Sequence, residues 1–216
     1  MRGHSGLAIG AALALTLLAT ADVFAHRTED YLQAARIGVE PDRVQITLDL
    51  TPGTVVAESF IAAIDRDGDG SLSAEEQRAY AGQMVGAMDV ALDGRSLRTR
   101  MRASSFPEAA AVRHGEGTIR LEIEAAVPDA SPGFHRLVFR NAHLAGHSAY
   151  LANALVPESD RVAVTAQRRD RDQSELAIEY TVQGGPAAAA LSWIFGSVAG
   201  AVLLVRARRW SDGRTR

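Results

Sequence analysis

Cysteine is absent from the 216 residues of this sequence. Thiol catalysis, disulfide exchange and cysteine-based zinc or iron–sulfur sites are therefore excluded. Lysine is absent too, so that all 23 basic residues are arginine. Familiar catalytic signatures are also missing from the sequence, which contains neither a nucleophile elbow nor a zinc-protease motif. We therefore expect a protein that is not an enzyme.

Long apolar runs occur only at the two ends of the chain. The first, residues 7–21, follows Arg2 and is interrupted only by Gly and Thr, and Ala25 provides the small residue that precedes a signal-peptidase cut. This run is shorter than the roughly 20 residues that span a bilayer. We therefore expect a cleaved signal peptide over residues 1–25.

The second apolar run, Pro186–Val205, contains no charged residue and is long enough to cross a bilayer as a helix. Five arginines and one aspartate follow it, and basic residues beside a span mark its cytoplasmic side. This flank favours a transmembrane helix over a buried helix of a soluble core. We expect a single-pass protein of the bacterial inner membrane, with a periplasmic domain and a basic cytoplasmic tail at 206–216.

Small residues recur along this second run, and Gly196 and Gly200 form a GxxxG pattern that allows close helix packing. The pattern predicts a homodimer, or a membrane-protein partner for the span. Gly184 and Gly185, placed before the span and the arginines, also resemble bacterial sorting signals that are clipped at the membrane. Whether the span is retained or clipped is open at this point.

The exported domain, residues 26–185, is acidic. It contains 17 Arg and 24 Asp plus Glu, which gives a net charge of −7. An acidic domain is poorly suited to binding nucleic acid, so we expect no such partner. Its length of about 160 residues is sufficient for one hydrophobic core.

Alternating apolar and polar residues predict that most of this domain is β-structure. The pattern is clearest at 44–50 and 119–123, and strands are also expected at 134–141, 161–167 and 175–182. The pair Asp93–Gly94 between two further strands is typical of a hairpin turn. We predict a mainly β, antiparallel, sandwich-like fold.

One region departs from this alternation and predicts two helices. Thr54 can cap a helix over residues 55–64, and a second helix is expected over 74–86, with Tyr80 and Met84 on its apolar face. The segment 104–117, which contains a proline and three consecutive alanines, is expected to be a mobile loop. The fold prediction is therefore a β domain with an inserted helix–loop–helix unit.

The loop between the two predicted helices carries oxygen-bearing residues at the spacing of a calcium site. In a twelve-residue EF-hand loop, ligands come from positions 1, 3, 5, 7, 9 and 12, with glycine at position 6. Gly70 holds position 6 and Leu72 is the apolar residue that anchors the loop. The expected Ca²⁺ ligands are Asp65, Asp67, Asp69, the backbone carbonyl of Ser71, Ser73 and Glu76.

Ser73 and Glu76 also form a capping box, so an acidic turn that merely starts a helix is the alternative interpretation. That alternative does not explain three aspartates at alternating positions followed by glycine. Residues 55–86 resemble an EF-hand, and no second copy occurs in the chain. The resemblance implies weak binding, with a Kd of about 10⁻⁴ to 10⁻³ M as in extracellular modules, and a structural role for calcium.

A broader resemblance covers residues 26–157. The Ala25–His26 junction, "PDRVQITLDLTPG", the helical pair, "VALDGRSL" and "SAYLANALVP" are similar to extracytoplasmic regions of the hydrogenase/urease accessory type of nickel–cobalt permease. This chain departs from that family because it has one expected span. The resemblance implies an alternative function, an accessory module of a transition-metal transport system.

Histidines could serve that alternative function. His143 and His147 are four residues apart, a spacing that on a helix would allow Zn²⁺, Ni²⁺ or Cu²⁺ binding, although Gly146 suggests a turn. His26, as the new N-terminus, could chelate copper through its amine and ring. His135 is expected at an exposed strand position.

Overall fold

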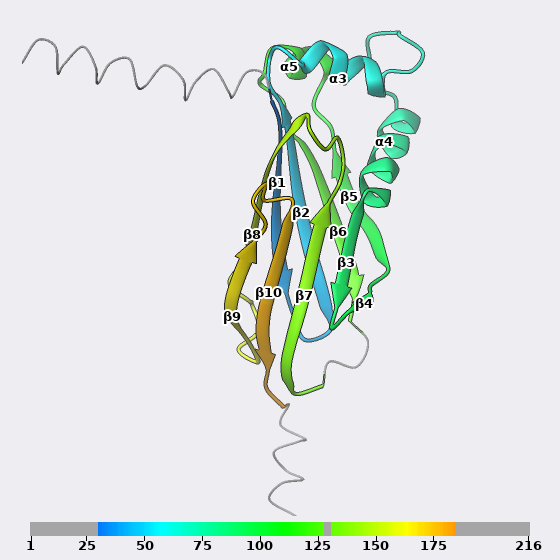
Figure 1. The fold of residues 1–216 in the computed structure, drawn as a ribbon. Helices are drawn as coiled ribbons and strands as arrows, with labels where there is room; N and C mark the ends of the chain where they lie inside the picture. Colours follow the sequence, from blue (N-terminus) through cyan, green and yellow to red (C-terminus); the bar gives the residue numbers. More distant parts are fainter. Residues whose placement is uncertain (1–29, 128–130, 185–216) are drawn as a thin grey trace, which may run out of the picture.

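A computed structural model describes residues 30–127 and 131–184, which form ten strands and three helices (Figure 1). The strands run between two ends of an elongated domain. The three helices lie at one end, which we call the helical end, and the described chain leaves from the other, which we call the exit end (Figure 1). The prediction of a mainly β fold is confirmed.

The first sheet has five strands in the order β5-β6-β2-β1-β8. All neighbours are antiparallel except β1 and β8, which run parallel. The strands are β1 Tyr31–Val39, β2 Arg43–Pro52, β5 Thr99–Ser105, β6 Ile119–Ala126 and β8 Ser148–Ala154.

The second sheet is antiparallel throughout and has the order β4-β3-β7-β10-β9. Asp93 and Gly94 connect β3 to β4 with φ angles of 50° and 78°, the left-handed conformation that the Asp-Gly pair predicted. The strands are β3 Met88–Leu92, β4 Arg95–Ser96, β7 Gly133–Asn141, β9 Val162–Arg169 and β10 Glu175–Val182.

The two sheets bury their apolar faces in one core. The alternating apolar residues of β2 all face the core, as predicted. Their exposed fractions are at most 1% for Val44, Ile46, Leu48 and Leu50. They belong to the same cluster as the apolar residues of the second sheet, such as Leu137, Phe139, Ile178 and Tyr180. Truncating one of these, for example Leu48→Ala, typically costs about 2–5 kcal/mol.

Strand β1 was not expected, because its sequence does not alternate. Leu32 is exposed whereas Gln33 next to it is buried, which reverses the polarity that a sheet face normally shows. The Gln33 amide is satisfied by the Asn141 side chain at 2.8 Å, the His143 carbonyl at 2.8 Å and Ser148 Oγ at 2.7 Å. These tertiary hydrogen bonds allow a polar residue inside, and no local pattern reveals them.

The helices are α3 Ala57–Ile64, α4 Ala74–Gly86 and α5 Ala109–Arg113. The bounds of α4 match the prediction, and Tyr80 and Met84 are buried as expected. Two expectations were wrong. Helix α3 begins two residues later, with Val56 at its cap and no capping by Thr54, and the expected loop 104–117 contains α5.

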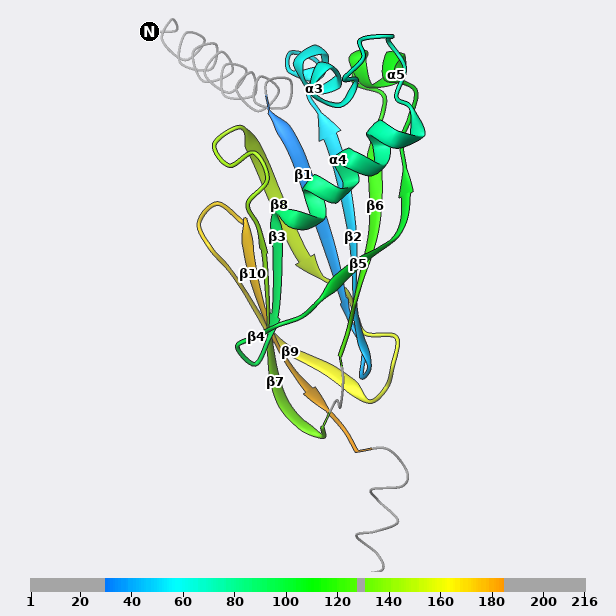
Figure 2. The same cartoon turned by 90° about the vertical axis from the view of Figure 1, so that its right-hand side faces the viewer.

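Helix α4 closes one side of the domain. It contacts β3 and β5, which belong to different sheets, while α3 contacts both α4 and α5 (Figure 2). The acidic loop, residues 65–76, connects α3 to α4 at the helical end. This arrangement attaches the loop to both sheets through α4.

The signal peptide expected at 1–25, the span at 186–205 and the tail at 206–216 lie outside the described residues. Within residues 30–127 and 131–184, no helix has the length and apolar character needed to cross a membrane.

Candidate metal centre

The first acidic residue of the loop is fixed by the end of α3. Phe60, Ile61 and Ile64 bury the apolar face of this helix in the core. Asp65 directly follows it, and its backbone N–H closes the last turn on the Ile61 carbonyl at 2.8 Å. The Asp65 side chain is therefore largely buried at a rigid position, although it carries a carboxylate.

The loop folds back around the Asp65 carboxylate. Oδ1 accepts the Gly68 N–H at 2.8 Å and Oδ2 accepts the Gly70 N–H at 3.0 Å. Both glycines have positive φ, 71° and 85°, which a residue with a side chain rarely adopts. This explains why glycine stands at position 6 of the loop.

Glu76 closes the loop from the first turn of α4. Its Oε2 accepts the Ser73 N–H at 2.9 Å and the Ser73 hydroxyl at 2.8 Å, and its Oε1 accepts the Arg66 N–H at 2.5 Å. These hydrogen bonds, those from Ser73 first, lower the pKa of Glu76 to about 2. Glu76 is thus ionised at neutral pH.

The two remaining aspartates are exposed and are held by their own backbone. Asp67 Oδ1 accepts the Asp69 N–H at 3.2 Å, and Asp69 Oδ1 accepts the Ser71 N–H at 2.7 Å. Each carboxylate keeps its second oxygen available. Leu72 packs partly buried against the core, which agrees with its expected anchoring role.

Three of the predicted ligands converge. Asp65, Asp67 and Glu76 each present an oxygen, and these three atoms lie within 4.8 Å of one another. Calcium binds oxygen at 2.3–2.6 Å, so ligands on opposite sides of one ion are about 4.6–5.2 Å apart. The three oxygens are therefore close enough together to contact one bound cation. Asp69 is not part of this group.

No ion pair joins a basic side chain to the carboxylates of the acidic loop in the described chain. The ion pairs of residues 30–127 and 131–184 all involve other carboxylates, and none reaches Asp65, Asp67, Asp69, Glu75 or Glu76. Backbone N–H groups are the compensating dipoles. Like charges this close repel each other, which a bound cation would relieve. A shallow pocket beside the loop, lined by Arg66, Asp67, Ser73 and Glu76 among others, gives solvent access.

The histidine pair has a different environment. Residues 143–146 form a turn rather than a helix, as Gly146 suggested, and His147 is exposed. His143 is half-buried with Nε2 3.3 Å from the Tyr80 hydroxyl, and burial lowers its pKa. Among the described residues, neither histidine belongs to a group of three His, Cys, Asp or Glu side chains that could hold a metal ion. His26 lies outside those residues.

His135 was wrongly expected to be exposed. It is 9% exposed, with Nδ1 2.8 Å from Asp93 Oδ2 and Nε2 2.8 Å from the Ser131 carbonyl. Both ring nitrogens face acceptors, an arrangement that a doubly protonated imidazolium satisfies. The hydrogen bond to Asp93 and then that to Ser131 raise the pKa of His135.

Sequence reasoning also missed a polar and aromatic cluster behind α4. It contains Tyr31, Gln33, Tyr80, Asn141 and His143. The one signal of this cluster in the sequence was the helical spacing that placed Tyr80 on the apolar face of α4. The other members could not be associated with Tyr80, because they come from β1, from β7 and from the turn after β7.

Comparison with models of protein families, with curated proteins and with solved structures finds no match to this chain.

Proposed function

We propose that this protein is a non-enzymatic calcium-binding protein whose acidic loop is a single EF-hand site. The observation that carries the proposal is the convergence of the Asp65, Asp67 and Glu76 oxygens within 4.8 Å, without a paired basic side chain among the described residues. Gly70, in a positive-φ conformation at position 6, supports the same interpretation.

In this proposal Asp65, Asp67 and Glu76 hold the ion, and Asp69, the Ser71 carbonyl and Ser73 complete its oxygen ligands. Calcium supplies two positive charges that join the end of α3 to the start of α4. Phe60 of α3 and Tyr80 of α4 already meet edge to face with ring centroids 5.6 Å apart. The ion would therefore clamp two helices that are packed together, which is a structural role.

The proposal also includes the location of the domain. Residues 1–25 act as an export signal and residues 186–205 as a span in the bacterial inner membrane, so that the domain is periplasmic. Divalent calcium outside the cytoplasm is abundant enough to occupy a site with a Kd of about 10⁻⁴ to 10⁻³ M.

The decisive experiment is thermal unfolding of the chelator-treated chain, titrated separately with Ca²⁺, Mg²⁺, Ni²⁺ and Cu²⁺. Calcium at ten times its Kd should stabilise the fold by about 1.4 kcal/mol. The best variant is Asp67→Asn, because Asp67 is exposed and an asparagine carbonyl can still accept the Asp69 N–H. It should weaken the Ca²⁺ response and leave the metal-free chain unchanged.

Glu75→Gln is the matched control. Glu75 is exposed and neighbours Glu76, but it does not belong to the converging group. Its variant should bind Ca²⁺ nearly as well as the original chain. A folded chain that does not respond to Ca²⁺, or an Asp67→Asn variant that responds fully, would reject the site. Stabilisation by Ni²⁺ or Cu²⁺ alone would favour the transition-metal alternative.

A further inference from the structure

Arginine is concentrated in one short stretch of an otherwise acidic domain. Residues 95–102, "RSLRTRMR", contain four arginines and no acidic residue, whereas residues 26–185 contain 17 Arg against 24 Asp plus Glu. The stretch includes β4 and the start of β5, which is the edge strand of the first sheet. Positive charge gathered on an acidic surface attracts anionic groups to that one place.

Strand pairing brings three of these arginines close to Arg43 of β2 on the outer face of the first sheet. Arg100 lies opposite Glu124 of β6, and Glu124 in turn lies opposite Gln45, two residues after Arg43. Arg98 and Arg100 line the same shallow pocket. We call Arg43, Arg98, Arg100 and Arg102 the arginine cluster.

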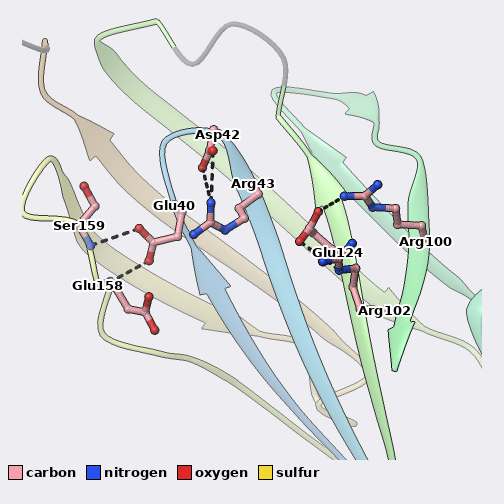
Figure 3. Close-up of polar contacts among 8 residues, drawn as sticks. All are labelled: Glu40, Asp42, Arg43, Arg100, Arg102, Glu124, Glu158 and Ser159. Carbon is pink, nitrogen blue, oxygen red and sulfur yellow. Dashed lines mark hydrogen bonds and ion pairs between the residues drawn. The ribbon is translucent and has the colours of Figure 1, made fainter. Parts of the chain in front are cut away.

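The Glu124 carboxylate shows how the cluster holds an anion (Figure 3). Its Oε1 accepts a hydrogen bond from Arg100 Nη2 at 2.5 Å, and its Oε2 lies 3.7 Å from Arg102 Nε. The hydrogen bond from Arg100 does most to lower the pKa of Glu124, and the charges of Arg102 and Arg43 lower it further. One carboxylate is therefore shared by several guanidinium groups.

The cluster has more positive charge than its own ion pairs use. Its four arginines share two carboxylate partners, Asp42 and Glu124, and Arg98 has no ion pair within residues 30–127 and 131–184. The side chains of Arg100 and Arg102 are 62% and 55% exposed. Because a guanidinium group carries five N–H donors, most of these donors are available to a ligand.

Arg98, Arg100 and Arg102 form a row, because they occupy alternate positions of the chain. Residues two apart along a strand point to the same face and are separated by about 7 Å. The register shift between Met101 and Ala103 does not interrupt the row, since Arg102 still reaches the carboxylate that Arg100 binds. An extended polypeptide presents its own alternate side chains at the same spacing.

We propose that the arginine cluster binds an extended acidic segment of a partner protein, with carboxylates at alternate positions. The planar guanidinium group suits carboxylates because it can donate two parallel hydrogen bonds. Charged residues on an edge strand such as β5 discourage contact with neutral or basic strands. The same arginines would therefore select an acidic partner and reject other partners.

This surface is separate from the acidic loop. Arg43 begins β2, and the ten residues of that strand span about 33 Å toward the helical end. The acidic loop lies at that end, beyond the strand (Figure 1). The carboxylates of the loop are thus too far away to neutralise the arginines of the same molecule, and the inference does not depend on calcium binding.

Fluorescence anisotropy of a labelled peptide, titrated with the full-length chain in the presence of a chelator, tests the proposal. The probe alternates Thr and Glu, and a peptide of the same composition with all Glu residues in one block is the control ligand. Arg98→Gln should raise the Kd of the alternating peptide about fivefold. Arg171→Gln is the matched control, because Arg171 is exposed in the turn between β9 and β10 and should leave this Kd unchanged.

Absence of binding to the alternating peptide at about 1 mM would overturn the proposal. Equal effects of the two substitutions, or equal binding of the blocked peptide, would also overturn it, because overall charge alone would then explain the attraction. Tighter binding of inorganic polyphosphate than of the alternating peptide would assign the cluster to a phosphate polymer instead. If Arg98→Gln does not fold, Arg102→Gln replaces it with the same expectations, since the ion pair of Arg102 is long at 3.7 Å.

Discussion

The hydroxyl oxygens of Tyr31 and Tyr80 lie 2.7 Å apart in the interior and join the first strand to the second helix. Both rings are at most 5% exposed, and burial raises the pKa of each phenol. Both are therefore neutral at every pH at which the domain is studied. One hydroxyl donates to the other, and His143 Nε2 lies 3.3 Å from that of Tyr80.

This geometry predicts unequal costs for removing the two hydroxyls. Tyr80→Phe leaves the buried Tyr31 hydroxyl without its partner and should destabilise by about 1–3 kcal/mol. Tyr31→Phe should cost less, because the Tyr80 hydroxyl still has His143 nearby. The double variant should cost less than the sum of the two single changes. Urea unfolding of the three variants measures this, and equal, additive costs would contradict it.

The pair of His135 and Asp93 predicts a pH dependence of stability. Burial is the largest single influence on the pKa of Asp93 and raises it, but the hydrogen bonds from His135 and from the Arg136 N–H together lower it overall. The pKa of His135 is raised. A raised histidine pKa gives stability that is complete below about pH 6.5 and is lost as the pH rises through the folded pKa. His135→Gln should therefore destabilise more at pH 5.5 than at pH 8.5.

The reference for that comparison is Asp93→Asn, which removes the charged partner and should reduce the same pH dependence, while the Ser131 carbonyl still favours the protonated ring. Combining the two changes should add little, because both remove one interaction. A difference between the original chain and His135→Gln that stays constant from pH 5.5 to 8.5 would show that this histidine is neutral.

The lowered pKa of Glu76 leads us to expect a second pH dependence of stability, at acidic pH. Its pKa is lowered from 4.5 to about 2, so its contribution to the metal-free fold is present above about pH 4.5 and is lost as the pH falls toward 2. Glu76→Gln should lower stability at pH 7 but have a much smaller effect near pH 2. Chemical unfolding without metal, with Glu75→Gln as reference, tests this; an effect independent of pH would contradict it.

Gly70 and Gly82 predict opposite effects of the same substitution. A Cβ at either position would meet no atom within 4 Å, so that only the backbone differs. Gly70 has φ +85°, and Gly70→Ala should cost about 1–2 kcal/mol and weaken Ca²⁺ binding. Gly82 lies inside α4 and is exposed, so Gly82→Ala should stabilise by about 0.5–1 kcal/mol. Thermal unfolding of both variants is the measurement, and a neutral Gly70→Ala would show that the loop can relax.

Local signals in the sequence determined several of the strands, such as β2 and β6, and helix α4. Strict alternation in β2 and β6 and the Asp93–Gly94 pair depend on neighbours two residues away, so the pattern is visible without the fold. The start of helix α4 is signalled by the capping box of Ser73 and Glu76, and that box is present in the structure. The sequence also determined which carboxylates stand at loop positions 1, 3, 5 and 12.

Tertiary structure decided what depends on distant residues. Strand β1 exists despite its broken pattern because Gln33 finds partners more than 100 residues away. His135 is buried because a hairpin 42 residues earlier presents Asp93. Likewise, the convergence of Asp65, Asp67 and Glu76, and the position of the loop opposite the exit end, follow from how α3 and α4 pack on the sheets. Such contacts are made through space, and a single sequence contains no local signal for them.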